Sequence, residues 1–331
     1  MKKGTIFLVV VDILIIAIVL LVKGPLKNKI IDSNINSKKK VVYSIYKEKD
    51  VKNYAVNNTK LKIEKAVEEA PEKIEAKTSK INEYDVKILT PDPNNNDYKL
   101  MKLEIGGYEA YLVAIYDPTK VHIITKQTLG TEVGERVISM CNRYGATVCI
   151  NGGSFVDYGT GSGIPQGYVI EGGKIRWSDG DSSKKRGNIV GITNEGKLKL
   201  LANTTGKEAL EQGVVDGLEF GPFLIVDGVP QNVGSQYVGG YSGAARVAIA
   251  QRKDGIMLFL VTNGYHGRGA TMGELVDALV KYGAYNAANL DGGASSTLAI
   301  KGQLVNYPRN IYGDLVAGGR PVVDGFGLIL K

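Results

Sequence analysis

The sequence predicts an α+β fold with mixed, largely antiparallel sheets and two main helices. Three observations favour this class: short β-branched runs recur along residues 99–331, glycine-containing turn signals separate them, and only two segments show helical spacing of apolar residues. The 42 glycines among 331 residues also indicate many turns rather than long helices.

The expected elements follow one another along residues 99–331. The first helix is expected at residues 131–144, and the second at residues 271–282, where Leu275, Ala278 and Leu279 recur at helical spacing before Gly283. Strands are expected at residues 111–116, 121–125, 146–150, 256–262, 285–290, 296–300, 304–307 and 322–330. Hairpin turns are expected at residues 171–174, 194–197, 227–228 and 253–255.

Residues 1–23 are predicted to be a membrane anchor. Residues 5–22 are apolar apart from Asp12, and as a helix they would span about 27 Å, close to the thickness of the hydrocarbon core. The run ends without the small residues of a cleavage site, so we expect the anchor to be retained. Residues 24–98, rich in Lys, Glu and Asn, are expected to form a charged stalk, and residues 99–331 a folded domain.

The net charge of +7 is concentrated near this anchor. Residues 1–40 hold eight lysines and two aspartates, a net +6, so the remaining residues carry only +1. A basic belt beside a membrane explains this balance better than a nucleic-acid surface, and no nucleic-acid partner is expected. The lysine count alone favours a cytoplasmic body, whereas long domains often translocate regardless of such counts.

The two cysteines, Cys141 and Cys149, are predicted to be buried free thiols. Cys141 falls on the apolar face of the expected helix and Cys149 inside a strand; a disulfide bond is the alternative. Two cysteines and two widely separated histidines do not readily supply a metal site, and no cofactor is expected. Whether a divalent ion assists stays open, with Asp157, Asp291 and Asp324 as candidate ligands.

Two loops share one local pattern. Each follows a Tyr-Gly-Ala sequence and an apolar strand: Asn151-Gly152-Gly153-Ser154 in the first, Asp291-Gly292-Gly293-Ala294-Ser295-Ser296 in the second. The intervening strands differ by an even number of residues, so Asn151 and Asp291 should point to equivalent faces. We expect the two loops to meet at one end of a sheet, with the glycines letting a ligand approach the backbone. A tight turn is the alternative for each.

Other candidate residues lie where strands meet glycine-rich loops. Arg246 and Arg320 are suited to grip phosphate with the guanidinium, although single arginines are normally surface residues. His266 lies in a glycine-rich loop, where a solvated side chain is the alternative. Glu274 is explained by a capping box with Thr271 and is left out of the catalytic set.

Together these residues resemble the phosphodiester glycosidase domain family, from about residue 108 to residue 330. The segments that fit best are, in order, residues 150–153, 221–224, 227–228, 246–249, 269–282, 289–296, 305–306 and 320–322. The chain departs from the family pattern at Ser154, where an aromatic residue is frequent, at Ala294, where a third glycine is frequent, and at Asn263, where Asp is frequent.

The resemblance implies a glycosidase that hydrolyses a sugar-1-phosphodiester linkage. Together with the predicted anchor, this leads us to expect a membrane-anchored enzyme that acts on a cell-surface or exopolysaccharide-type glycan, with its catalytic domain outside the cytoplasm. The phosphomonoester leaving group is already acidic, so the site must mainly hold phosphate charge and stabilise an oxocarbenium-like centre. The predicted catalytic residues are Asp291, Asn151 and Arg246. The predicted substrate-binding residues are Gly152, Gly153, Gly292, Gly293, Ser295, Ser296, His266 and Arg320.

Each of these residues has an expected role. Arg246, with Arg320 and the Gly292 and Gly293 amides, would hold the phosphate. Asp291 would act as nucleophile, base or electrostatic stabiliser, and Asn151 would position sugar hydroxyls. A non-catalytic, membrane-tethered module that binds polysaccharide or cell wall is the alternative function. A cell-wall amidase or peptidase lacks its nucleophile or metal ligands in this sequence.

Overall fold

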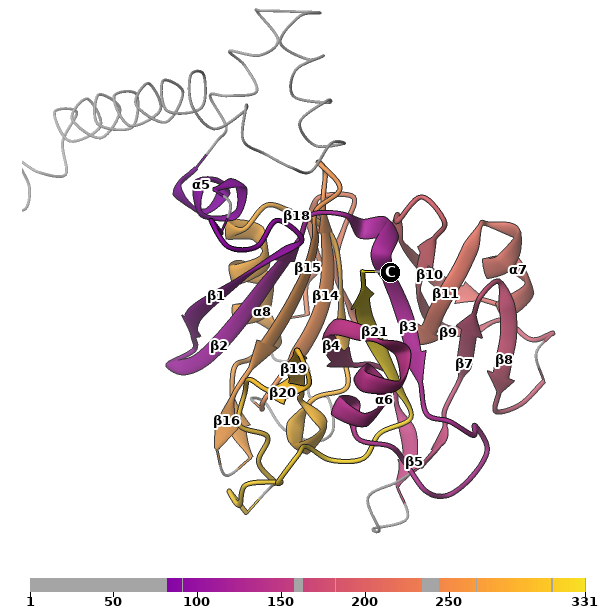
Figure 1. The fold of residues 1–331 in the computed structure, drawn as a ribbon. Coiled ribbons are helices and arrows are strands. Elements are labelled where there is room, and N and C mark those ends of the chain that lie inside the picture. Colours follow the sequence, from indigo (N-terminus) through magenta and orange to yellow (C-terminus); the bar gives the residue numbers. More distant parts are fainter. Residues whose placement is uncertain are drawn as a thin grey trace, which may run out of the picture. The chain divides into compact units, whose positions relative to one another are not determined.

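The computed structural model describes residues 82–90, 92–157, 163–181, 183–233, 244–265, 267–310 and 312–330 (Figure 1). The predicted membrane anchor, most of the predicted stalk and His266 lie outside these ranges. Across the ranges that are described, no helix has both the length and the apolar character needed to span a bilayer. The described residues belong to two units, residues 82–90 and residues 92–330.

The first unit contributes one helix, α5 (Glu83–Leu89). Asn82 caps it: the side-chain oxygen accepts hydrogen bonds from the N–H groups of Tyr84 and Asp85, each at 2.9 Å. The Asp85 carboxylate in turn accepts the Asn82 N–H at 3.0 Å. This reciprocal capping box stabilises a short helix within the predicted stalk.

The second unit is built on antiparallel sheets, and every strand pair in its described part is antiparallel. The seven-stranded sheet has the order β1 (Tyr98–Ile105), β2 (Tyr108–Ile115), β15 (Met257–Thr262), β14 (Val247–Arg252), β18 (Ala284–Leu290), β12 (Phe223–Val226) and β13 (Val229–Pro230). One five-stranded sheet has the order β10 (Leu198–Thr204), β9 (Arg186–Thr193), β11 (Val214–Glu219), β7 (Tyr168–Glu171) and β8 (Lys174–Ser178). The other has the order β20 (Gln303–Leu304), β19 (Leu298–Ile300), β4 (Ala146–Asn151), β21 (Asp324–Ile329) and β3 (Val121–Thr125).

Two short hairpins complete the strands: β5 (Phe155–Asp157) with β6 (Gly163–Pro165), and β16 (Gly264–Tyr265) with β17 (Arg268–Gly269). The four predicted hairpin turns are confirmed as the connections β7–β8, β9–β10, β12–β13 and β14–β15. In each, a glycine-containing turn connects two neighbouring antiparallel strands.

Side chains from all three large sheets form one apolar core. Val113 of β2, Val148 of β4, Val190 of β9, Phe259 of β15 and Phe326 of β21 are all fully buried in it. At roughly 25 cal/mol per Å² of apolar surface removed from water, this shared core is the main reason that the three sheets hold together. The strand ends that carry the candidate site are therefore fixed relative to one another.

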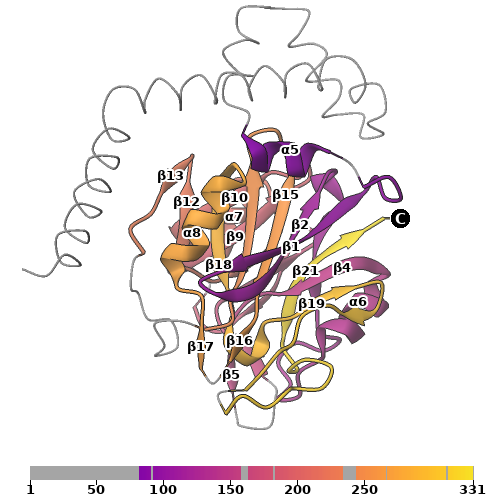
Figure 2. The same ribbon diagram turned by 90° about the vertical axis from the view of Figure 1, so that its left-hand side faces the viewer.

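Helices pack on the outer faces of the sheets (Figures 1 and 2). The helix α6 (Val137–Tyr144) packs on the five-stranded sheet that contains β4, and α7 (Gly206–Glu211) packs on the one that contains β9. The helix α8 (Met272–Lys281) packs against β18 and β12. Short 3-10 turns, η2 (Pro118–Lys120) and η3 (Gly293–Ser295), occur before β3 and after β18.

The two predicted helices are present, and one of them begins later than predicted. For α8, Thr271 and Glu274 form the expected capping box, and Gly283 follows with φ of +76°. The helix α6 begins at Val137 rather than at residue 131, because Glu135 instead exchanges backbone hydrogen bonds of 2.9 Å with Val322. The helix α7 was outside the predicted elements.

Cys141 and Cys149 are joined by a disulfide bond, so the prediction of free thiols is wrong. Gly145, with φ of +64°, ends α6 and turns the chain directly into β4. This reversal brings the Cα atoms of Cys141 and Cys149 to 6.0 Å, within the range that a disulfide requires.

Candidate active site

The two predicted glycine loops meet. Asn151 Nδ2 donates a hydrogen bond of 2.7 Å to the main-chain oxygen of Asp291, and the Asp291 N–H donates one of 2.8 Å to Gly152 O. The strands that lead into the loops, β4 and β18, belong to different sheets rather than to one. The meeting of the loops is therefore confirmed, and it occurs between two sheets that pack together.

Asn151 joins the loops rather than facing a ligand. Its residue is fully buried, and its Oδ1 accepts the Thr297 N–H at 2.9 Å while its Nδ2 is bonded to Asp291. With these bonds the amide fixes two backbone segments. Both ends of the amide are therefore occupied within the protein, and the predicted contact with sugar hydroxyls has no support in this geometry.

Asp291 carries the carboxyl group at the centre of this meeting point. The residue is half-buried, and its carboxyl group lies deep enough for burial to raise its pKa to about 6. The nearby Ser295 hydroxyl, the positive charge of Arg320 and the Gly292 N–H oppose this shift, whereas the charge of Asp157 adds to it. Asp291 can therefore exchange a proton near neutral pH, as a general base must.

Asp324 is a second carboxyl group at the site, at the start of β21. It is 2% exposed, and its Oδ1 accepts the Gly153 N–H at 2.6 Å. Burial raises the pKa of Asp324 to about 7; the hydrogen bond from Gly153 opposes this shift and the charge of Asp291 adds to it. Asp324 was expected only as a candidate metal ligand, although an acid within the apolar run 322–330 is a signal of a functional residue.

Arg320 supplies the positive charge at the site. Its guanidinium forms an ion pair with Asp157 and lies 5.0 Å from the ring centre of Phe155, both on β5. The Arg320 side chain is 25% exposed, so a ligand can reach it. Because its charge lowers the pKa of Asp291, this predicted binding residue and this predicted catalytic residue lie close together.

The Arg246 side chain is buried in the protein and is not exposed at the Asp291 loop. Its backbone neighbours the Asp291 loop, because Val247 pairs with Leu290 in the adjacent strands. Its side chain is buried, however, with the residue 2% exposed and Nε donating to Ala270 O at 3.2 Å. Burial lowers the pKa of Arg246. Of the two arginines predicted to hold phosphate, Arg246 therefore has a buried side chain and Arg320 a partly exposed one.

Two of the loop glycines, Gly152 and Gly292, are required by close packing inside the protein. A Cβ atom on Gly152 would lie 2.4 Å from the Leu218 side chain, and one on Gly292 would lie 2.6 Å from Ala245 O. The Gly293 N–H already donates to Ala245 O at 2.8 Å. The N–H groups of Gly152, Gly153 and Gly293 all donate hydrogen bonds within the protein, so none of them is available to bind a ligand as predicted.

Three buried polar atoms near Asp291 make no hydrogen bond of normal geometry within the described part of the chain: Ser295 Oγ, Ser296 Oγ and Asn289 Oδ1. Buried polar groups are nearly always bonded, so such a group calls for a ligand or an ordered water. Ser295 and Ser296 were predicted binding residues. Asn289 was not, although it lies two residues before Asp291 on the same face of β18.

A polar pocket of about 400 Å³ opens beside these loops. Its position follows from Ser154, next to the Gly153 that binds Asp324, and from Gly221, whose oxygen accepts Asn289 Nδ2 at 3.1 Å. The pocket is lined by Ser154, Gln166, Gly167, Asp179, Gly187, Asn188, Glu219, Phe220 and Gly221. Such a mixture of amide, hydroxyl and carboxyl groups with one aromatic ring suits a hydroxyl-rich ligand.

The sequence also raised a possible metal site, a binding role for His266 and a departure from the family pattern at Asn263. Within the described ranges, no group of three or more His, Cys, Asp or Glu side chains is arranged to hold a metal ion. His266 lies outside those ranges, so its predicted binding role stays a prediction. Asn263, a departure from the family pattern, accepts the Tyr307 N–H at 3.0 Å and thereby ties two surface loops together.

Replacing Arg320 is expected to weaken binding of an anionic ligand and to change a titration. We expect Arg320→Gln to raise the KM for a sugar phosphodiester about tenfold, the effect of losing one charge-assisted contact of roughly 1.4 kcal/mol. Because the Arg320 charge lowers the pKa of Asp291, the acidic limb of the rate profile should move to higher pH. Steady-state kinetics across a pH series test both effects.

A matched control for Arg320 is Arg176→Gln. Arg176 also pairs with an acid, Glu171, at 2.8 Å, but on β8. Its replacement should leave KM and the acidic limb unchanged. If the Arg320→Gln protein behaves like the Arg176→Gln control, Arg320 does not take part in binding the ligand.

Comparison with known proteins points to one family. The model of the phosphodiester glycosidase family matches residues 144–329. The SPbeta prophage-derived uncharacterized protein YomE of Bacillus subtilis (strain 168) is 27% identical over 197 residues, covering 58% of this chain and 30% of that protein. Human N-acetylglucosamine-1-phosphodiester alpha-N-acetylglucosaminidase is 39% identical over 66 residues, covering 20% of this chain and 13% of that protein. The matched part thus spans less than a third of either relative.

Solved structures share the fold. The catalytic domain of zebrafish N-acetylglucosamine-1-phosphodiester alpha-N-acetylglucosaminidase, auto-inhibited by its pro-peptide, has a TM-score of 0.57 at 19% identity, covering 72% of this chain and 86% of that one. A hypothetical protein from Synechocystis has a TM-score of 0.53 at 17% identity, covering 70% and 61%. At these identities the likeness concerns the arrangement of strands and helices.

Proposed function

Because this chain belongs to the phosphodiester glycosidase family, we propose that it hydrolyses the bond between an anomeric carbon and a phosphate oxygen. The observation that carries the proposal is Asp291, with its pKa raised to about 6, in a loop on which the charge of the partly exposed Arg320 acts and beside which the polar pocket opens. In this arrangement a sugar would enter the pocket and its phosphate would meet Arg320.

The proposed reaction needs one base and no strong acid. A water molecule attacks the anomeric carbon, Asp291 accepts its proton, and the carbon–oxygen bond to phosphate breaks. The phosphomonoester leaves with the bonding electrons, and its acidity makes protonation unnecessary. The Ser295 hydroxyl, which lowers the pKa of Asp291, would hold that carboxylate in place, and the fully buried Ser296 hydroxyl and Asn289 amide oxygen would bind ordered water behind it.

The direct test is an assay with the full chain. A nitrophenyl phosphodiester of N-acetylglucosamine 1-phosphate is incubated with the protein, and the released sugar is measured by chromatography. Release of the free sugar supports the proposal. Binding without release would instead favour the alternative function, a polysaccharide-binding module, which the departures at Asn263 and Ala294 would then explain.

The rate is expected to depend on pH through both carboxyl groups. Asp291 must be ionised to accept a proton, so the rate should rise as the pH passes about 6. Asp324, with a pKa of about 7, should lose its proton above that pH and place a second negative charge beside an anionic substrate, so the rate should fall. A bell-shaped profile of kcat/KM is the expected result.

The Asp324→Asn protein separates the two limbs. An amide stays neutral at every pH, so we expect the fall above pH about 7 to disappear and the rise near pH 6 to remain. An alkaline limb that persists in this variant would show that another group titrates there. Asp324 is proposed as a positioning residue, and this pH readout separates that role from loss of stability.

We also propose that the domain works outside the cytoplasm, held to the membrane by residues 1–23. The apolar run at residues 5–22 and the disulfide between Cys141 and Cys149 support this, because disulfides persist mainly in oxidising compartments. Alkylation of cysteines in intact cells, read by mass spectrometry, tests it: two thiols that react before any reductant is added would contradict the proposal.

A further inference from the structure

Exposed aromatic side chains gather beside the candidate site. Within the described residues, the large apolar side chains with high exposure include three tyrosines: Tyr265 at 53%, Tyr307 at 57% and Tyr312 at 72%. All three lie in two segments, the β16–β17 hairpin and the loop at residues 305–320. Exposed aromatic groups that cluster in this way mark binding surfaces more often than scattered single side chains do.

Arginines lie among these tyrosines. The Arg309 guanidinium lies 5.4 Å from the ring centre of Tyr265, and its Nη1 donates to Gly313 O at 2.6 Å. Arg268 is exposed and stands opposite Tyr265 in the hairpin register, so both side chains leave the same face. We name Tyr265, Arg268, Tyr307, Arg309 and Tyr312 the tyrosine–arginine surface.

This surface is attached directly to the Asp291 loop. Asn306, next to Tyr307, donates from Nδ2 to Ser296 O at 2.8 Å. Tyr307 N–H donates to Asn263 Oδ1 at 3.0 Å, which ties the loop at residues 305–320 to the hairpin. That loop ends at Arg320, whose charge acts on Asp291. In both views β16 lies at the same end of the unit as β5 (Figures 1 and 2).

The charge of the two segments indicates an anionic ligand. Their described residues contain Arg268, Arg309 and Arg320 against one acid, Asp314, which already accepts a hydrogen bond of 3.1 Å from Asn310. Arg320 is paired with Asp157 of β5, so Arg268 and Arg309 carry the excess positive charge. A guanidinium suits the geometry of phosphate, and an exposed tyrosine ring offers an apolar face to a sugar ring. Alternating rings and arginines therefore fit a chain of alternating sugars and phosphates.

We propose that the tyrosine–arginine surface binds the glycan chain that continues beyond the cleaved bond, so that the substrate is a polymer of phosphodiester-linked sugars. This inference rests on the proposed function in one respect, namely that the cleaved bond lies at Asp291. In this proposal the polar pocket takes the sugar whose bond is cleaved, and the tyrosine–arginine surface takes the repeats that follow its phosphate.

Binding to an inactive protein tests the surface separately from hydrolysis. The full chain carrying Asp291→Asn is titrated by calorimetry with poly(N-acetylglucosamine 1-phosphate) and with the corresponding single sugar phosphodiester. Adding Tyr265→Ser, Tyr307→Ser and Arg309→Gln should weaken polymer binding about tenfold relative to binding of the single unit, as expected for loss of a cation–π and stacking platform. An uncharged N-acetylglucosamine oligomer should bind the unaltered surface more weakly than the phosphate polymer.

A matched control is available at the opposite end of β18. Tyr285 lies under the Lys253 ammonium at 4.9 Å, a similar aromatic–cation pair far along the strand from Asp291. Tyr285→Ser with Lys253→Gln should not change the ratio of polymer to single-unit affinity. Equal ratios in the surface variant and in this control would overturn the proposal, as would equal binding of charged and uncharged chains. If hydrolysis fails while these affinities behave as expected, only the proposed function is lost.

Discussion

Asp291→Asn is expected to lower kcat/KM for a sugar phosphodiester by on the order of 10³-fold or more, the range seen when a group central to the chemistry is removed. The amide keeps the size of the side chain but cannot accept a proton from water or carry negative charge beside the anomeric carbon. Binding should survive, because Arg320 and the pocket remain. The loss should therefore appear in kcat rather than in KM.

The measurement has an internal control and an independent signature. Asp277, an exposed acid on α8, gives the matched variant Asp277→Asn, which should keep full activity. Because the charge of Asp291 raises the pKa of Asp324, the Asp324 carboxyl should titrate at lower pH in the Asp291→Asn protein, which NMR can follow. Near-full activity of this variant would refute the assignment of Asp291.

The parts of the fold that depend on local sequence were predictable. The hairpins follow from glycine-containing turns between alternating strands, and α8 follows from the Thr271–Glu274 capping box and Gly283. The start of α6 was not, because Glu135 pairs with Val322, a residue far along the chain. Local propensity carries no information about such a partner.

The candidate site, like the fold, could be predicted from the sequence only in part. The repeated Gly-Gly loops indicated that Asn151 and Asp291 would meet, and hydrogen bonds between the loops confirm it. The sequence could not reveal which arginine faces the site, since Arg246 and Arg320 both follow small residues and differ only in burial. It also could not reveal Asp324 as the partner of Asp291, because their proximity depends on how two sheets pack.

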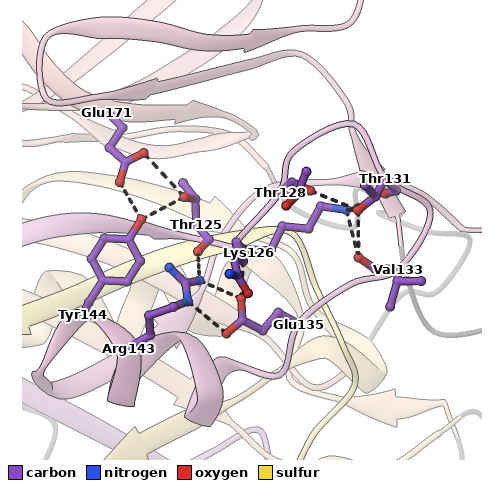
Figure 3. A network of polar contacts seen from close by, with 10 residues as sticks. Thr125, Lys126, Thr128, Thr131, Val133, Glu135, Arg143, Tyr144 and Glu171 are labelled. Carbon is purple, nitrogen blue, oxygen red and sulfur yellow. Dashed lines mark hydrogen bonds and ion pairs between the residues drawn. The ribbon is translucent and has the colours of Figure 1, made fainter.

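Lys126→Met is expected to destabilise the protein by about 3 kcal/mol, because the four oxygens that the buried ammonium holds together would lose their common donor. Lys126 is 3% exposed, and its ammonium donates to the oxygens of Thr131, to Val133 O at 3.0 Å and to Gly163 O at 2.8 Å. Figure 3 shows the side chain reaching into the turn at Thr131 and Val133. Burial lowers the pKa of Lys126, and the neighbours that hold its charge are oxygen dipoles.

Loss of the Lys126 hydrogen bonds should also affect the candidate active site. Gly163 begins β6, which pairs with the β5 strand that carries Phe155 and Asp157, the two neighbours of Arg320. On the other side, the Lys126 N–H donates to Val323 O at 2.9 Å, one residue before Asp324. Releasing Lys126 therefore loosens the support of Arg320, and we expect the KM for a phosphodiester to rise together with the fall in stability.

Thermal unfolding and kinetics of one variant pair test this coupling. A loss of about 3 kcal/mol should lower the Tm by roughly 6–12 °C in a domain of this size. Lys174→Met, which alters an exposed lysine on β8, should change neither Tm nor KM. A Lys126→Met protein as stable as the Lys174→Met control would mean that the cost of burying the ammonium cancels its contacts. Methionine at position 126 would then stabilise the protein as well as lysine does. In that case the turn at Thr131 and Val133 and the β5–β6 hairpin would have to be held by their backbone pairing alone.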